Sequence, residues 1–531
     1  MFLILSGAYI TQELSSEFGS IPPSFLPLGN RRLFQQQLKL VPPGRVIYMS
    51  VPDTYEILKD DRAWLENNHV QLIEICADLS LGESLVSTLN IIGQDVGRPL
   101  HILFGDTLLK TLPEGDDLIA TAKAVENYKW SSVDNGKVNW LSNKNVESDY
   151  TKKNIVCGYF KFSQPRVLIS SITKARWDFL SGLNNYHEKI GLTPIIVDDW
   201  LDFGHVNTYY HSKVEFTTQR SFNELRITPS WIEKSSVNSN KIQAEANWFN
   251  SIPGHMRLYI PQYLGAQHPI NANFSYRLEY LHNTALNELY VFSEIPSPLW
   301  NSIISHCLDF IDDCYLCKAP NTNKGLSIAS LFIDKTNQRL IEFMDSRDIH
   351  LHDIWNFNGI EDATIDDLLA MSKKWLPVNE QDSTLMHGDF CFSNILYDFR
   401  SNRIKTIDPR GVTSDGEHSI YGHSIYDIAK LSHSILGMYD WIVAGYHSTA
   451  IDWKNKKINF SISGERKHKN THVTFLEIIN NRYKLNALNL YAMQLQLFLS
   501  MLPLHADDIN RQNGLFSNAF RIYSLMKGYE K

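Results

Sequence analysis

The sequence predicts two domains in series: an α/β domain built on a parallel sheet, then an α+β domain that begins with strands and becomes mostly helical. Over residues 1 to about 110, short apolar runs alternate with helical segments. Near residues 212–220 the pattern changes to two strand candidates around a Thr-Pro-Ser turn, and helical spacing dominates after about residue 295. The length of 531 residues also favours more than one core. We therefore place the domains at residues 1–214 and 215–531.

The strand candidates of the first domain are short and apolar throughout. They read "FLILSG", "RVIYMSVP", "VQLIEICA" and "LHILFGDTLL", with the helical stretch "GESLVSTLNIIG" before the last one. Strands that are apolar on both faces are typical of a parallel sheet covered by helices on both sides. Ligands of such sheets bind beyond the carboxyl ends of the strands, and Asp106 follows "HILFG" directly at such an end.

Charge and cysteine content exclude several classes of protein. A formal net charge of −8 argues against a protein that coats nucleic acid, because broad phosphate binding needs a concentrated positive field. The six cysteines are scattered, which favours reduced thiols and a cytoplasmic protein. Cys314 and Cys317 form a single CxxC pair, for which ordinary half-buried thiols are favoured over a zinc or redox role.

Neither apolar terminal segment predicts a membrane span. The opening run "MFLILSG" is short and lacks a basic leader, so we expect a first strand there. The late segment "ALNLYAMQLQLFLSML" is interrupted by Asn489, Gln494 and Gln496, which favours a buried helix.

The stretch "LMHGDFCFSNILYDFRSNRIKTIDPRG", Leu385 to Gly411, places polar residues between apolar runs in a pattern that suits phosphoryl transfer. This reaction needs a group that orients and deprotonates the acceptor hydroxyl, and metal ions that neutralise phosphate charge. Asp389 suits the first task, and Asn394 and Asp408 offer the oxygen ligands that Mg²⁺ prefers. We assign His387 to the same catalytic loop, where we expect it to shape the loop through hydrogen bonds.

The motif "HGDFCFSNILYD" followed by "IKTIDPRG" resembles the catalytic core of the aminoglycoside phosphotransferase and choline kinase superfamily. The resemblance implies a bilobal, protein-kinase-like fold, with an amino-terminal lobe of about residues 215–285 and a helical carboxy-terminal lobe of about 286–531. It also implies ATP as the phosphoryl donor and a lysine–glutamate pair at the phosphates. Lys234, at the end of a strand candidate, and Glu245, on the next helix, have the required order.

The first domain resembles the sugar-phosphate nucleotidyltransferase family, whose fold is a Rossmann-like mixed sheet. The matching pieces, in order, are "FLILSGA", "PPSFLPLGNRRLFQQQL", "LFGDTLL", "VDNGKVNWLSNK", "GYFKFS" and "WLDFGHVNTYYHSK". The resemblance implies Mg²⁺ held by Asp106 and Asp202, and Lys144 on the sugar phosphate. It further implies that Gly7 lies in the loop that binds a second nucleoside triphosphate, such as CTP or UTP.

The first loop departs from that family. It reads "SGAYITQELSSEFGS", with only Gly7 before two bulky residues, and Pro23 stands where the family has a lysine. Backbone amides and a cation must close on a triphosphate, so this loop is remodelled. Arg31 and Arg32 are the nearest candidates to replace the missing charge. The domain is then either active with an altered loop, which the retained carboxylates favour, or a scaffold or sensor without triphosphate binding.

Together these patterns predict a cytoplasmic, bifunctional transferase. It phosphorylates a small hydroxylated substrate, a sugar or an amino alcohol, and transfers a nucleotidyl group to the resulting phosphate. The family resemblance places such enzymes in capsule or lipopolysaccharide precursor synthesis. The expected partners are this substrate and nucleotides, with no nucleic acid. Two alternatives stay open: a single-activity kinase with a degenerate first domain, and a non-catalytic, nucleotide-responsive assembly protein.

Overall fold

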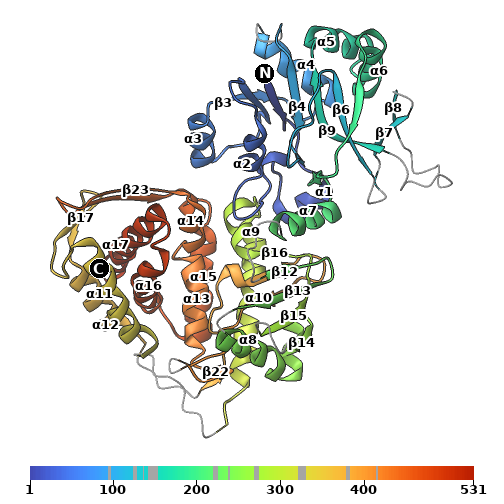
Figure 1. Cartoon of the computed structure of the whole chain (residues 1–531). Helices are drawn as coiled ribbons and strands as arrows, with labels where there is room; N and C mark the ends of the chain where they lie inside the picture. Colours follow the sequence, from blue (N-terminus) through green and yellow to red (C-terminus); the bar gives the residue numbers. More distant parts are fainter. Residues whose placement is uncertain are drawn as a thin grey trace. The chain divides into compact units, whose positions relative to one another are not determined.

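The computed structural model of the chain describes residues 1–93, 97–123, 128, 130–134, 137–140, 154–218, 225–236, 239–267, 274–320, 330–377, 383–413 and 416–530. The chain divides into two compact units (Figure 1). Unit 1 comprises Met1–Thr217 together with the short segment Phe292–Glu294, and unit 2 comprises Thr218–Val291 together with Ile295–Lys531. The predicted class, an α/β domain followed by an α+β domain, is confirmed.

Unit 1 is built on a mixed sheet with the strand order β10-β6-β9-β4-β1-β2-β3. Its strands are β1 (Phe2–Leu5), β2 (Ile47–Pro52), β3 (Val70–Ile75), β4 (Leu100–Phe104), β6 (Leu118–Lys123), β9 (Asn154–Phe162) and β10 (Thr193–Ile196). The short strands β7 (Ser131–Asp134) and β8 (Lys137–Trp140) extend β9. The strands β3, β2, β1 and β4 run parallel as predicted, whereas β9 runs antiparallel to both β4 and β6.

Helices cover both faces of this sheet (Figure 1). One face carries α4 (Leu81–Ile92), α5 (Pro165–Lys174) and α6 (Phe179–Ile190), and the other carries α2 (Phe34–Gln37) and α3 (Lys59–Asn67). The strand β1 shows why its sequence is apolar throughout: Leu3 packs into the first core and Ile4 into the second. The helices α1 (Gln12–Phe18) and α7 (Val206–Thr218) complete the unit.

Unit 2 begins with a small antiparallel sheet of order β12-β13-β15-β14. The strands are β12 (Leu225–Ile227), β13 (Trp231–Ser235), β14 (Tyr263–Gln267) and β15 (Ser275–Glu279), and α8 (Ser239–Ser251) follows β13. Trp248 of α8 donates a hydrogen bond from its indole nitrogen to the Met386 carbonyl, at 2.8 Å. The helix is thereby tied to the chain directly before the "HGD" motif.

The rest of unit 2 is mostly helical. Its helices are α9 (Leu286–Phe292), α10 (Ser297–Leu316), α11 (Lys335–Arg347), α12 (Ile365–Trp375), α13 (Ile425–Ile435), α14 (Tyr439–Ala444), α15 (Lys469–Tyr483), α16 (Ala487–Met501) and α17 (Ile509–Glu530). Three small sheets lie among them: β16-β20-β21 (Thr284–Ala285, Ile395–Asp398, Arg403–Thr406), β19-β22 (Thr384–Leu385, Tyr421–Gly422) and β18-β17-β24-β23 (Glu361–Ala363, Trp355–Phe357, Lys457–Ile462, His447–Asp452).

The apolar helix α16 is buried, as the sequence predicts. With the turn that follows it, Ala487–His505 is the one segment of the described chain that is long and apolar enough to cross a membrane, and 72% of its most apolar window is buried inside the structure. Its two glutamines bind neighbouring helices: Gln496 donates to the Ser372 hydroxyl at 2.9 Å, and Gln494 donates to the Ser432 hydroxyl. The polar residues that interrupt the run therefore have partners in the helical core.

Arg32 is part of a buried ion pair in unit 1. Its Nε lies 3.1 Å from Asp61 Oδ2, both side chains are at most 1% exposed, and its Nη1 donates to the Phe25 carbonyl at 2.7 Å. The prediction that Arg32 replaces a missing phosphate-binding cation is therefore wrong, because its guanidinium is committed to the core. Arg31 is exposed and remains a candidate for that role.

Removal of Asp61 should strongly destabilise unit 1, because Arg32 would be left as an uncompensated buried charge. We expect Asp61→Ala to lower the free energy of unfolding by about 3–5 kcal/mol. Glu66→Ala, an exposed change in the same helix, should cost less than about 0.5 kcal/mol. Urea unfolding monitored by hydrogen exchange of the β1 and β2 amides measures both values. Equal effects of the two changes would contradict the importance of the pair.

Candidate functional site

The "HGD" loop of unit 2 runs from β19 to β20 and ends in a tight helical turn, Phe392–Asn394. The Asn394 amide nitrogen donates to both the Asp389 carbonyl and Asp389 Oδ2, each at 2.9 Å. These bonds fix the orientation of the Asn394 side chain and use its nitrogen. Its carbonyl oxygen accepts a long hydrogen bond from the Ser393 hydroxyl, at 3.5 Å, and has a second lone pair for a cation.

His387 connects this loop to the loop that carries Asp408. Its Nε2 donates to the Ile407 carbonyl at 2.9 Å, and its Nδ1 accepts from the Asp389 amide at 3.3 Å. Burial lowers the pKa of His387 to about 4, so the ring is neutral at physiological pH. With both nitrogens bound to backbone groups, the imidazole shapes the loop and is not free to move a proton.

Asp427, near the start of α13, binds the backbone of the catalytic loop. Its two carboxylate oxygens accept hydrogen bonds from the His387 and Gly388 amides, both at 2.8 Å. These two bonds brace the catalytic loop against α13. Burial raises the pKa of Asp427 to about 7, although both amides act to lower it.

Lys430, one turn further along α13, is a site residue that the sequence did not reveal. Its Nζ lies 2.8 Å from Asp389 Oδ1. Burial alone would raise the pKa of Asp389, but Lys430 and the Asn394 amide outweigh burial and keep this pKa below its ordinary value. Asp389 is therefore an ionised carboxylate, with 41% of its side chain exposed. The spacing of three residues after Asp427 on a helix was the available signal.

Lys234, at the end of β13, bridges two carboxylates. Its Nζ lies 2.7 Å from Glu245 Oε2 on α8 and 3.0 Å from Asp408 Oδ1, and the Tyr276 hydroxyl also donates to Glu245. Burial opposes the charge on Lys234, but both carboxylates raise its pKa. The predicted lysine and glutamate are thus brought together beside Asp408, which is 47% exposed. Their role at the nucleotide phosphates stays a prediction.

In unit 1, a two-stranded sheet brings Asp106 and Asp202 together. The strand β5 (Thr107–Leu108) pairs antiparallel with β11 (Leu201–Asp202), so that Asp202 lies opposite Thr107. A Cβ added to Gly204 would lie 2.6 Å from Asp106 Oδ2 and 3.3 Å from Asp202 Oδ1. Both carboxylates therefore converge on the same small volume beside a glycine.

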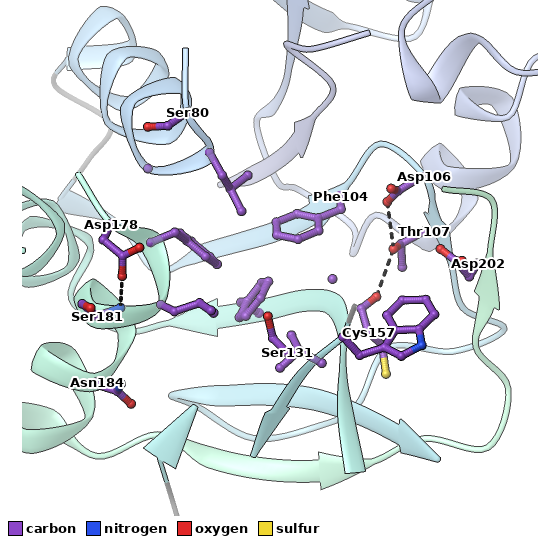
Figure 2. A pocket seen from close by; sticks show the side chains of 18 of the residues that line it. Ser80, Phe104, Asp106, Thr107, Ser131, Cys157, Asp178, Ser181, Asn184 and Asp202 are labelled. Carbon is purple, nitrogen blue, oxygen red and sulfur yellow. Dashed lines mark hydrogen bonds between the residues drawn. The ribbon is translucent and has the colours of Figure 1, made fainter. Parts of the chain in front are cut away.

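These carboxylates open into a cavity of about 890 Å³. In Figure 2, Asp106 and Asp202 lie on one side of it, and Asp178, Ser181 and Asn184 lie on the opposite side. Burial, followed by the charge of Asp202, raises the pKa of Asp106. A cation between the two groups would relieve this repulsion.

His205 and Thr208 complete the surroundings of Asp202, and neither was predicted from the sequence. His205 Nδ1 lies 3.2 Å from Asp202 Oδ2, and the Thr208 hydroxyl donates to the same oxygen. Burial lowers the pKa of His205, but the hydrogen bond and the charge of Asp202 outweigh burial and raise it. Their closeness to Asp202 in the sequence, between β11 and the first turn of α7, was the available signal.

The remaining predicted residues of unit 1 have less structural support. Gly7 is buried, and a Cβ there would lie 2.2 Å from Ile75 Cδ1, so close packing already explains the glycine. Its contact with a nucleotide stays a prediction. Lys144 lies outside the described residues.

The donor sets fit magnesium in chemical type. No group of three or more histidine, cysteine, aspartate or glutamate side chains that could hold a metal ion occurs within the described ranges. Mg²⁺ keeps several waters and takes one or two carboxylates from the protein. The pair Asp106 and Asp202 fits this requirement, as does Asp408 with the amide oxygen of Asn394.

Comparisons with known proteins give likenesses at the level of structure. No family model matches the chain, and no curated protein matches it. A nucleoside-diphosphate-sugar pyrophosphorylase from Vibrio cholerae RC9 is 13% identical with a TM-score of 0.33, covering 40% of this chain and 99% of that one. The inositol-1-phosphate CTP transferase from T. maritima is 13% identical with a TM-score of 0.31, covering 42% and 97%.

A second group of solved structures consists of aminoglycoside phosphotransferases. A thermostable mutant of aminoglycoside phosphotransferase APH(4)-Ia is 12% identical with a TM-score of 0.35, covering 60% of this chain and 99% of that one. The structural neighbours thus include a nucleotidyltransferase-type group, similar to the amino-terminal part, and a phosphotransferase-type group.

Replacement of Asp427 should loosen the catalytic loop. In Asp427→Asn, an NH2 group replaces one of the two carboxylate oxygens, so one backbone N–H faces another donor and is left unsatisfied. We expect a loss of about 1–3 kcal/mol in stability and faster hydrogen exchange of the His387 and Gly388 amides. Asp366→Asn, an exposed change on α12, is the matched control. Unchanged exchange in Asp427→Asn would refute the bracing role.

Proposed function

We propose that the chain is a cytoplasmic, bifunctional transferase in which residues 215–531 act as an ATP-dependent kinase and residues 1–214 as a nucleotidyltransferase. The observation that carries the proposal is the convergence of Asp389, Asn394 and Asp408 on two adjacent loops of unit 2. Lys430 supports the first of these residues and Lys234 supports the last.

The kinase chemistry follows from the state of each group. Asp389 is ionised and half-exposed, so it can accept the proton of an acceptor hydroxyl. The hydroxyl oxygen then bonds to the γ-phosphorus of ATP, the bond to the β–γ bridging oxygen breaks, and ADP leaves. Lys234 supplies a fixed cation close to Asp408. Bound Mg²⁺ would neutralise charge on the phosphates, with Asn394 and Asp408 as its protein ligands.

The nucleotidyl transfer is supported by the carboxylate pair beside the cavity of unit 1. Asp106 and Asp202 would hold Mg²⁺, and the cavity offers space for a phosphorylated substrate. Fusion of the two activities raises the effective concentration of the phosphomonoester that the second reaction consumes. The resemblance of the two domains to paired kinases and nucleotidyltransferases supports our proposal of a role in precursor supply for surface polysaccharides.

A second candidate function is a kinase whose first domain binds no triphosphate. The burial of Arg32 favours it, because this arginine cannot supply the charge that the first loop lacks. The proline at position 23, in the short helical turn Pro23–Phe25, points in the same direction. The retained pair of Asp106 and Asp202 favours the bifunctional proposal.

Asp389→Asn should abolish phosphorylation while nucleotide binding persists. An amide cannot take up the hydroxyl proton, so we expect kcat to fall by about 10²–10⁴-fold. The affinity for ATP should change less than about threefold, because Asn394 and Asp408 remain. Mass spectrometry of a panel of sugars, sugar acids and amino alcohols identifies the acceptor, and calorimetry with ATP measures binding. Glu417→Gln, an exposed change, is the control. A parallel loss of ATP affinity and turnover would count against Asp389 as the base.

Calorimetry with CTP, UTP, GTP and dTTP tests unit 1. We expect one of them to bind in the presence of Mg²⁺, and its affinity to fall by about tenfold or more in Asp106→Ala, because a metal ligand is lost. Asp116→Ala removes an exposed carboxylate of the same unit and should have no effect. Absence of metal-dependent binding would favour the single-activity kinase.

A further inference from the structure

Cations gather around Asp389 on the side of the helical part of unit 2. Besides Lys430, they include Lys335 at the start of α11, Arg339 one turn later, and Arg410, two residues after Asp408. Burial lowers the pKa of Lys335 to about 8. The charges of the three other cations also lower this pKa. Asp389 is the acidic neighbour that opposes this shift.

Ring packing brings Lys335 and Lys430 together. Phe332 packs against Tyr426, with ring centroids 5.4 Å apart. Phe332 lies in the π-helical segment Ser330–Asp334 that leads into α11, and Tyr426 lies on α13, so this contact joins the two helical segments that carry Lys335 and Lys430. The helix α11 is fastened by Arg339, which donates to the Ser500 carbonyl at 3.2 Å.

Arg410 is held against the catalytic loop from the other direction. Its backbone amide donates to the His387 carbonyl at 2.8 Å. A Cβ on Gly388 would lie 2.7 Å from Arg410 Cβ, so the arginine side chain starts directly beside the residue that precedes Asp389.

The side chains of Lys335 and Arg410 have no direct polar partner in the described part of the chain. Among the described residues, neither side chain has a hydrogen bond or an ion pair, and both are half-buried. The nearby carboxylates are already bound: Asp389 to Lys430, and Asp427 to two amides. Half-buried, unpaired cations cost stability, and a bound anion would remove this cost.

We propose that the acceptor of unit 2 is a hydroxyl compound that carries an anionic group, a carboxylate or a phosphate, and that this group binds Lys335 and Arg410 beside Asp389. The proposal rests on the kinase function proposed above. It excludes polycationic acceptors, because these would meet the like charges of Lys335 and Arg410 beside Asp389. In this proposal Lys335 binds the acceptor, whereas Lys234 binds the phosphates of the nucleotide.

Matched acceptors test the charge preference. With ATP and Mg²⁺, glycerate and glycerol phosphate are compared with glycerol, and gluconate and glucose 6-phosphate with glucose. We expect kcat/KM to be about tenfold or more higher for an anionic member of a series, and the two kinds of anion distinguish carboxylate from phosphate recognition. Faster turnover of glycerol, glucose, ethanolamine or kanamycin would overturn the proposal and leave the kinase function standing.

Binding of inorganic phosphate, measured by calorimetry on the full chain, tests the site without turnover. We expect Lys335→Met to weaken phosphate binding by about tenfold, with Lys373→Met, an exposed change on α12, as control. Thermal unfolding confirms that each variant is folded. Phosphate binding that is absent from the wild type or insensitive to Lys335→Met would overturn the proposal. If no acceptor is phosphorylated but Lys335 binds phosphate, the kinase function fails and the anion site stands.

Discussion

The double ion pair of Lys234 is the interaction on which the site of unit 2 depends. One ammonium joins Glu245 of α8 to Asp408, which follows β21. Without it, two carboxylates would face each other at the junction of the small sheet and the loops, and their repulsion would drive them apart. The tie from Trp248 to the Met386 carbonyl acts in the same direction, because it attaches α8 to the start of the catalytic loop.

The repulsion between neighbouring carboxylates is offset differently in the two candidate sites. In unit 2 each carboxylate has a fixed cation, so the ionised form is stabilised before any ligand binds. In unit 1, Asp106 lies beside Asp202 with burial raising its pKa, and His205 supports only the second of them. Unit 1 therefore depends more on an added cation than unit 2 does.

Much of this arrangement could be predicted from local sequence. The order of Lys234 and Glu245 is local, and the "HGD" motif with Asn394 lies on one loop. Apolar runs located the strands of unit 1, but periodicity carries no strand direction, so β9 was not foreseen as antiparallel. Lys430 escaped because its significance depends on its distance to Asp389 in space. Arg32 was misjudged because a charged residue in a polar segment gives no sign of a buried partner on another helix.

The burial of Arg32 also restricts how unit 1 can change over evolutionary time. Because the core needs the Arg32 side chain to pair with Asp61, this arginine cannot also bind a ligand. A cation that binds a triphosphate therefore has to come from an exposed position of the first loop, such as Arg31, or from a different loop. Core packing and ligand binding thus compete for the same few basic residues, and in unit 1 the core holds Arg32.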